Sequence, residues 1–170
     1  SAPAFVLSYV LTATNVQSAS NVSAAALSED VELLSPDGDD LVGSWSTDTG
    51  ATTSLFASID EQPFNDTDYI RSEVNPSTSV VRFTITNPSG AVDPASDHKV
   101  QYRYYKEDAA GQQIDLVVRL KQGASTSVAT WTHANIGGSV IQAIQTLTGG
   151  QVSAITDYND LRLEFQANAP

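Results

Sequence analysis

The residues best suited to acid–base chemistry are two histidines, His98 and His133. Acyl transfer needs a nucleophile with a base in reach, and the sequence contains no Cys and no G-x-S-x-G turn that would expose a serine. His98 lies between Asp97 and Lys99, which predicts a solvated residue at the start of a strand. His133 follows Trp131 by two positions, which predicts a place at a strand end. We therefore expect neither histidine to be catalytic, and we expect a protein that is not an enzyme.

Carboxylates are the other abundant chemical groups. Two acids at a suitable separation could hydrolyse glycosides, but nothing in the sequence singles out a pair among the twenty Asp and Glu residues. The run from Ser35 to Asp40 and the run from Asn65 to Asp68 hold enough oxygen donors for calcium. Neither matches an EF-hand loop, and Asp in such runs commonly forms turns. We expect no cofactor, with calcium as the alternative.

Aromatic residues give a third option, because exposed Trp and Tyr rings can stack on sugars. The candidates for glycan contact are Trp45, Tyr102, Tyr104 and Tyr105. In an extended strand Tyr102 and Tyr104 share one face and Tyr105 points the other way, so at least one ring is predicted to lie in the core. Trp131 shares a side with Ala129 and His133 and is also predicted to pack in the core.

The elements that would position these residues are short strands. Leu116, Val118 and Leu120 alternate with polar or smaller residues, as do the runs 80–85 and 161–166. This period of two is typical of antiparallel strands with one buried face, and Gly, Pro and Asn separate the runs. The pattern predicts an all-β protein, an antiparallel β-sandwich of jelly-roll type over residues 36–170. One short helix is expected between Gln151 and Asp157.

Residues 1–35 differ in composition and are predicted to form an extended N-terminal arm and linker. Alternating apolar residues suggest a strand that pairs with another protein, with Phe5, Val6, Leu7, Tyr9 and Leu11 as its interface. The stretch from Thr12 to Ala26 is rich in Ser, Ala and Thr and reads as a linker. Leu27, Val31 and Leu34 are spaced i, i+4, i+7, which allows a short helix near 27–34.

Charge narrows the choice of partners. The 170 residues carry a formal charge of −12, all eight Lys and Arg lie after position 70, and eleven of the twenty acids lie before it. Nucleic acid and anionic membrane surfaces both need basic contacts, so neither is expected as a partner. The stretch Phe5–Leu11 is interrupted by Ser8 and has no preceding basic residue, which predicts neither a signal peptide nor a membrane span.

Several segments in order resemble a β-sandwich domain that recurs in virion structural proteins of tailed bacteriophages and prophages. They include GSWSTDTG at 43–50, LFASIDE at 55–61, DTDYIRS at 66–72, HKVQYRY at 98–104, LVVRLKQG at 116–123, TWTH at 130–133 and LTGGQ at 147–151, followed by DYNDLRL at 157–163. The resemblance covers about residues 37–168 and brings no catalytic motif with it.

The resemblance implies a head decoration or tail accessory protein. We expect a non-enzymatic structural protein, made in the host cytoplasm and located in the virion, that decorates the capsid and docks through its N-terminal arm. Its expected partners are the major capsid protein or other virion proteins and further copies of itself, with a trimer favoured. The alternative is a carbohydrate-binding, host-adhesion module of a tail or fibre.

Overall fold

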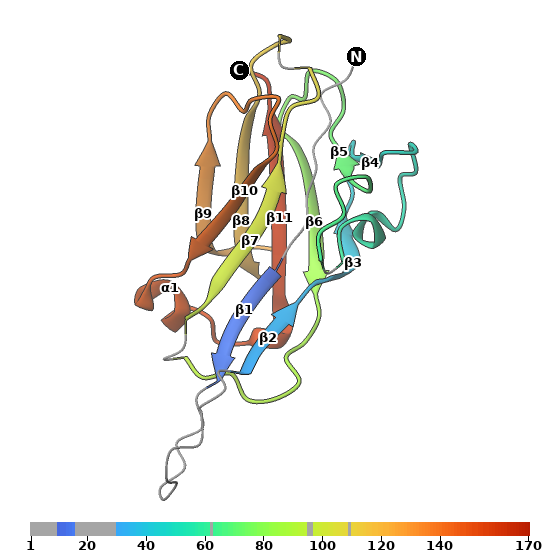
Figure 1. The fold of residues 1–170 in the computed structure, drawn as a ribbon. Coiled ribbons are helices and arrows are strands. Elements are labelled where there is room, and N and C mark those ends of the chain that lie inside the picture. Colours follow the sequence, from blue (N-terminus) through green and yellow to red (C-terminus); the bar gives the residue numbers. More distant parts are fainter. Residues whose placement is uncertain (1–9, 16–29, 62, 95–96, 109) are drawn as a thin grey trace, which may run out of the picture.

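A computed structural model describes residues 10–15, 30–61, 63–94, 97–108 and 110–170. The fold is built almost entirely from antiparallel strands in two main sheets (Figure 1). The four-stranded sheet has the order β10 (Ile141–Thr146), β7 (Lys99–Tyr104), β1 (Val10–Asn15), β2 (Asp30–Leu34). The five-stranded sheet has the order β3 (Pro36–Leu41), β6 (Ser79–Ile85), β11 (Leu161–Asn168), β8 (Asp115–Gln122), β9 (Thr126–His133).

The two sheets pack face to face because β6, β7 and β8 bury alternate side chains along most of their length. In β6 the buried positions alternate strictly, with Val81, Phe83 and Ile85 facing inward. Tyr102 of the four-stranded sheet meets Phe165 of the five-stranded sheet with ring centroids 6.1 Å apart. The predicted all-β antiparallel sandwich is confirmed, and the jelly-roll type stays a prediction.

The remaining elements are small. β4 (Ser46–Thr47) pairs with β5 (Ile70–Arg71), and two 3-10 turns, η1 (Leu55–Ser58) and η2 (Tyr158–Asp160), lie in the connections. The short helix predicted between Gln151 and Asp157 is present as α1 (Gly149–Ser153), which begins two residues earlier. A capping box fixes its start: Thr148 Oγ1 accepts from the Gln151 amide, and the Gln151 side chain accepts from the Thr148 amide at 2.8 Å.

The predicted helix near 27–34 is wrong for the part that the structure describes. Asp30–Leu34 is strand β2, antiparallel to β1, with Leu34 opposite Leu11 and Asp30 opposite Asn15. Leu34 is 2% exposed and its neighbour Leu33 is 46% exposed, so burial follows a period of two rather than a helical period. Pairing with a distant strand outweighed the helical spacing of three apolar residues.

The predicted boundary between an arm at 1–35 and a domain at 36–170 also changes. Strands β1 and β2 belong to the four-stranded sheet, and β1 lies inside it between β7 and β2 (Figure 1). Residues 12–15 of the predicted linker are therefore strand. The predicted interface residues Phe5, Val6, Leu7 and Tyr9 lie outside the described residues. Among the helices of the described chain, none is long and apolar enough to cross a membrane.

Candidate functional site

His133 lies between two tyrosines of the opposite sheet. Its Nε2 is 2.6 Å from the Tyr102 hydroxyl and its Nδ1 is 2.9 Å from the Tyr104 hydroxyl. The Gln145 side-chain amide donates to the Tyr102 hydroxyl at 3.3 Å. His133 is the last residue of β9, as the sequence predicted, and both tyrosines project inward from β7. The imidazole thus joins β9 to β7, and Gln145 of β10 joins the cluster through the Tyr102 hydroxyl.

Burial decides the protonation of this cluster. It lowers the pKa of His133 and raises the pKa of both Tyr102 and Tyr104, so a neutral imidazole between protonated tyrosines is favoured at neutral pH. A neutral imidazole donates from one nitrogen and accepts at the other, and two hydroxyls satisfy both. Both ring nitrogens are thus held by tyrosine hydroxyls, and the cluster ties the two sheets together.

His98 is buried, which corrects the prediction of a solvated residue. It is 1% exposed, and its Nε2 lies 2.9 Å from the Tyr158 hydroxyl. Its backbone carbonyl accepts from the Leu147 amide at 2.8 Å, which holds the start of β7 against the residue that follows β10. The charged neighbours Asp97 and Lys99 suggested solvent, but the alternation of β7 places His98 on the same inward face as Val100 and Tyr102.

In the first proposed calcium-binding run, Ser35–Asp40, the carboxylates make structural contacts within the fold. Asp39 accepts from the amides of Leu55 and Phe56 at 3.0 and 2.9 Å and so caps η1. Asp37 accepts from the Thr84 hydroxyl at 2.6 Å, and Asp40 pairs with two arginines. The three carboxylates thus have separate partners on η1, β6 and β11, which is a structural use of this run.

The second run, Asn65–Asp68, is also engaged in local contacts. Asn65 Oδ1 accepts from the Thr67 amide at 3.1 Å and from its hydroxyl at 2.7 Å, which is an Asx turn. Asp66 pairs with Arg103 at 2.6 Å. Within the described residues, no three His, Asp or Glu side chains gather closely enough to hold a metal ion.

The predicted glycan-contacting aromatics do not form an exposed platform. Trp45 and Tyr102 are 0% exposed and Tyr104 is 7% exposed, so their ring faces belong to the core. Tyr105 is half-buried and packs edge-on against Tyr69, with centroids 6.3 Å apart. The prediction that at least one tyrosine lies in the core is confirmed, and Trp131 is half-buried against it. The glycan interpretation is wrong for Trp45, Tyr102 and Tyr104 because stacking needs an open ring face.

A shallow polar hollow of about 450 Å³ lies near β4. It is lined mainly by hydroxyl side chains, with Asp48 and Asp68 as its carboxylates, and none of its ten lining residues is aromatic. A sugar site normally combines polar groups with an apolar or aromatic wall. This hollow lacks that wall.

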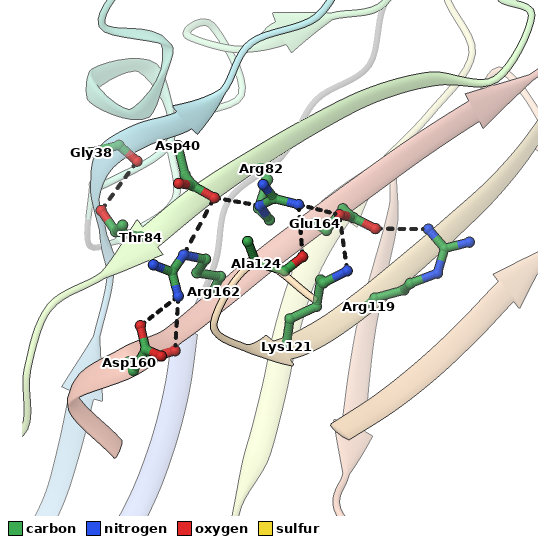
Figure 2. Close-up of polar contacts among 10 residues, drawn as sticks. All are labelled: Gly38, Asp40, Arg82, Thr84, Arg119, Lys121, Ala124, Asp160, Arg162 and Glu164. Atoms are coloured by element: carbon green, nitrogen blue, oxygen red, sulfur yellow. Dashed lines mark hydrogen bonds and ion pairs between the residues drawn. The ribbon is translucent and has the colours of Figure 1, made fainter. Parts of the chain in front are cut away.

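Polar side chains on the outer face of the five-stranded sheet form a network that the sequence analysis did not foresee. Glu164 of β11 is the centre: its carboxylate lies 2.9 Å from Arg119 and 3.1 Å from Arg82, and Lys121 is 3.5 Å away (Figure 2). Arg119 and Arg82 stand directly opposite Glu164 on the two neighbouring strands. The Glu164 side chain is only 8% exposed, so the paired charges shield this part of the outer face from solvent.

A second acid continues the network. Asp40 of β3 pairs with Arg82 and, at 3.3 Å, with Arg162, which also pairs with Asp160 at 2.5 Å (Figure 2). Burial opposes the charge on Arg82, but the hydrogen bonds that Arg82 donates to the Asp40 and Glu164 carboxylates, together with their negative charge, outweigh it and raise the pKa of this arginine. The alternation in β6, β8 and β11 placed these groups on the outer face, but only the strand order shows that they meet.

A buried lysine is another feature that periodicity could not reveal. Lys106 is 4% exposed, and its Nζ donates to the carbonyls of Gly111 and Gln112 at 3.3 and 3.2 Å. A hollow of about 130 Å³ lies beside it, lined also by Asp108 and Ile114. The ammonium group holds the loop between β7 and β8 in place with two of its three donors, which is a structural role.

One long stretch of the chain carries no formal charge. Residues 122–156 contain no Asp, Glu, Lys or Arg, although the chain as a whole carries −12. This stretch holds β9, β10 and α1, and Figure 1 shows β9 and β10 as the outermost strands of their sheets on the same side of the molecule. Val140, Ile141 and Ile144 are exposed here. Lys99 and Arg103 of β7 border this uncharged stretch, and the uncharged strand β10 is the element best suited to contact another protein.

Comparisons with protein-family models, with curated proteins and with solved structures found no match to this chain.

Proposed function

We propose that the chain is a non-enzymatic structural protein of a tailed-bacteriophage particle and that it decorates the capsid. One observation carries the non-enzymatic part: a half-buried imidazole and two carboxylates that could otherwise act as acids or bases are engaged in structural contacts. His133 is held by two tyrosines, Glu164 by three cations and Asp39 by two amides. The resemblance of the ordered segments at 43–163 supports the phage part.

Docking would use stretches of the chain without charged side chains. Residues 122–156 and residues 1–9 carry none, so neither stretch would add charge repulsion to contact between acidic neighbouring copies. The major capsid protein and further copies of the chain are the proposed partners, and the virion is the proposed location. A tail or fibre module that binds glycans has less support, because three of its four proposed contact rings are buried.

Immunogold electron microscopy tests this role. Antibodies raised against the purified chain should label the heads of phage particles that are encoded by the same genome as the chain. Quantitative mass spectrometry should find hundreds of copies per particle. Label restricted to tail tips, with a handful of copies, would favour the adhesion module. Particles without the chain would overturn the proposal.

A separate assay tests the absence of catalysis. The purified chain should not hydrolyse esters, peptides or cell-wall glycans above a buffer blank. Hydrolysis that is lost in His133→Gln, while the variant keeps its circular dichroism spectrum, would contradict a purely structural role.

A further inference from the structure

The free edge of β10 lacks the features that normally protect the edge of a sheet. Within the described part of the chain β10 pairs only with β7, so its other edge has no strand beside it. Its sequence, IQAIQT, contains neither a charged residue nor proline. Ile141 and Ile144 are 44% and 55% exposed. Natural edges usually carry Lys, Pro, a bulge or a covering loop, so this edge is open to pairing.

The other outer strands of the two main sheets are protected. β2 carries Asp30 and Glu32, and β3 carries three aspartates and two shifts in its register with β6. The pairing of β9 with β8 shifts in register at Leu120/Lys121, where a bulge distorts the edge. Only β10, among these described outer strands, combines a regular register with the absence of charge.

Charge indicates the kind of partner. The charged residues that stand opposite β10 on β7 are Lys99 and Arg103, so a basic protein would be attracted to the acidic first half of the chain rather than to this edge. A second copy carries the same −12, so contact between two copies is least opposed where the facing strands carry no acid. The strand β10 carries none, and a second β10 is a strand of matching length and composition.

We propose that two copies of the chain pair through β10, antiparallel about a two-fold axis perpendicular to the four-stranded sheet. Such an axis keeps the outer faces of the two copies' four-stranded sheets on the same side. Each outward-facing residue of one β10 therefore lies beside an outward-facing residue of the other. In the register that centres on Ile144, this residue of one copy stands opposite Ile144 of the other, and Ile144 is the most exposed isoleucine of the chain. The two four-stranded sheets become one continuous sheet, and each copy covers the open edge of the other. This pairing is independent of the proposed phage role.

Sedimentation of the full-length chain tests the pairing with a matched pair of variants. Ile144→Lys places two like charges opposite each other across the axis, whereas Leu33→Lys makes the same kind of change at an exposed position of β2, the opposite outer strand of the same sheet. Wild type and Leu33→Lys should form concentration-dependent dimers at about 0.15 M salt. Ile144→Lys should weaken the dimer by at least about tenfold. A monomer at every concentration, a trimer, or dimerisation unaffected by Ile144→Lys would overturn the proposal.

Cysteine cross-linking tests the register. Because the chain has no native cysteine, any disulfide must form between the introduced residues. Opposed residues of an antiparallel pair have Cβ atoms about 4.5–5.5 Å apart, close enough for a disulfide after small shifts. Ile144→Cys should form a covalent dimer on mild oxidation, and Leu33→Cys should not. Equal cross-linking of the two variants, or none in Ile144→Cys, would overturn the Ile144-centred pairing.

Discussion

Glu164 and Arg119 stand directly opposite each other on β11 and β8, and their charged atoms are 2.9 Å apart. Arg82 on β6 completes a row of three charges across three adjacent strands. A carboxylate shared among Arg119, Arg82 and Lys121 is the least replaceable group on the outer face of this sheet, because its removal leaves the cations facing one another.

Replacing this carboxylate should therefore destabilise the fold. Glu164→Gln is expected to lower the free energy of unfolding by about 3 kcal/mol, since it breaks a largely buried ion-pair network. Asp97→Asn is the control: Asp97 is 74% exposed and pairs with Lys99 at 3.6 Å, so its loss should cost less than about 1 kcal/mol. Urea unfolding at constant pH measures both. Equal effects of the two variants would contradict a special role for Glu164.

His133 should make stability depend on pH. Burial lowers its pKa below the ordinary value of 6.5, so the unfolded chain binds a proton that the folded chain resists. The contribution of His133 is complete above pH 6.5 and is lost as the pH falls from 6.5 towards the folded-state pKa. Wild type should therefore lose more stability than His133→Gln between about pH 7.5 and pH 5.5.

The comparison of the two proteins isolates this histidine, because His98 and every carboxylate are common to both. Urea unfolding at the two pH values gives the measurement. Identical losses in wild type and His133→Gln would show that protonation of this imidazole is not linked to folding.

The Asp39 carboxylate should stabilise the segment from β3 to η1. Asp39→Ala removes the acceptor of the Leu55 and Phe56 amides and should cost about 1–2 kcal/mol, as the loss of a helix cap does. Asp39→Asn keeps one oxygen acceptor and should cost less. Thermal and urea unfolding measure both variants. If calcium raised the melting temperature of wild type but not of Asp39→Asn, this carboxylate would be a ligand rather than a cap.

Strand β1 should be necessary for folding. Deletion of residues 1–15 removes a strand that lies between β7 and β2, so both neighbours lose their ladder partners in the middle of the sheet. The deletion should broaden or abolish the cooperative unfolding transition. Deletion of residues 1–8 keeps all of β1 and is the matched control. A 16–170 fragment that unfolds like the full chain would contradict the position of β1 inside the sheet.

Local patterns in the sequence determined the strands that alternate cleanly. The runs 80–85, 116–121 and 161–166 became β6, β8 and β11, because alternation of side chains along a strand is a property of neighbouring residues. The short helix was predicted at Gln151–Asp157 and lies at Gly149–Ser153, and the capping box that fixes its start is a local feature that spans only Thr148 to Gln151. The same alternation predicted two packed sheets with a common core.

Only the tertiary structure decided which distant residues meet. Arg82 and Glu164 are 82 positions apart, and Tyr104 and His133 are 29 apart, so no local period relates them. Asp30–Leu34 has helical spacing but becomes a strand because β1 offers a complete ladder of hydrogen bonds. His98 and Trp45 are buried although their sequence neighbours are polar, and His98 is packed against Tyr158, which lies 60 positions away. Strand order sets these contacts, and strand order depends on the cooperative packing of the entire chain.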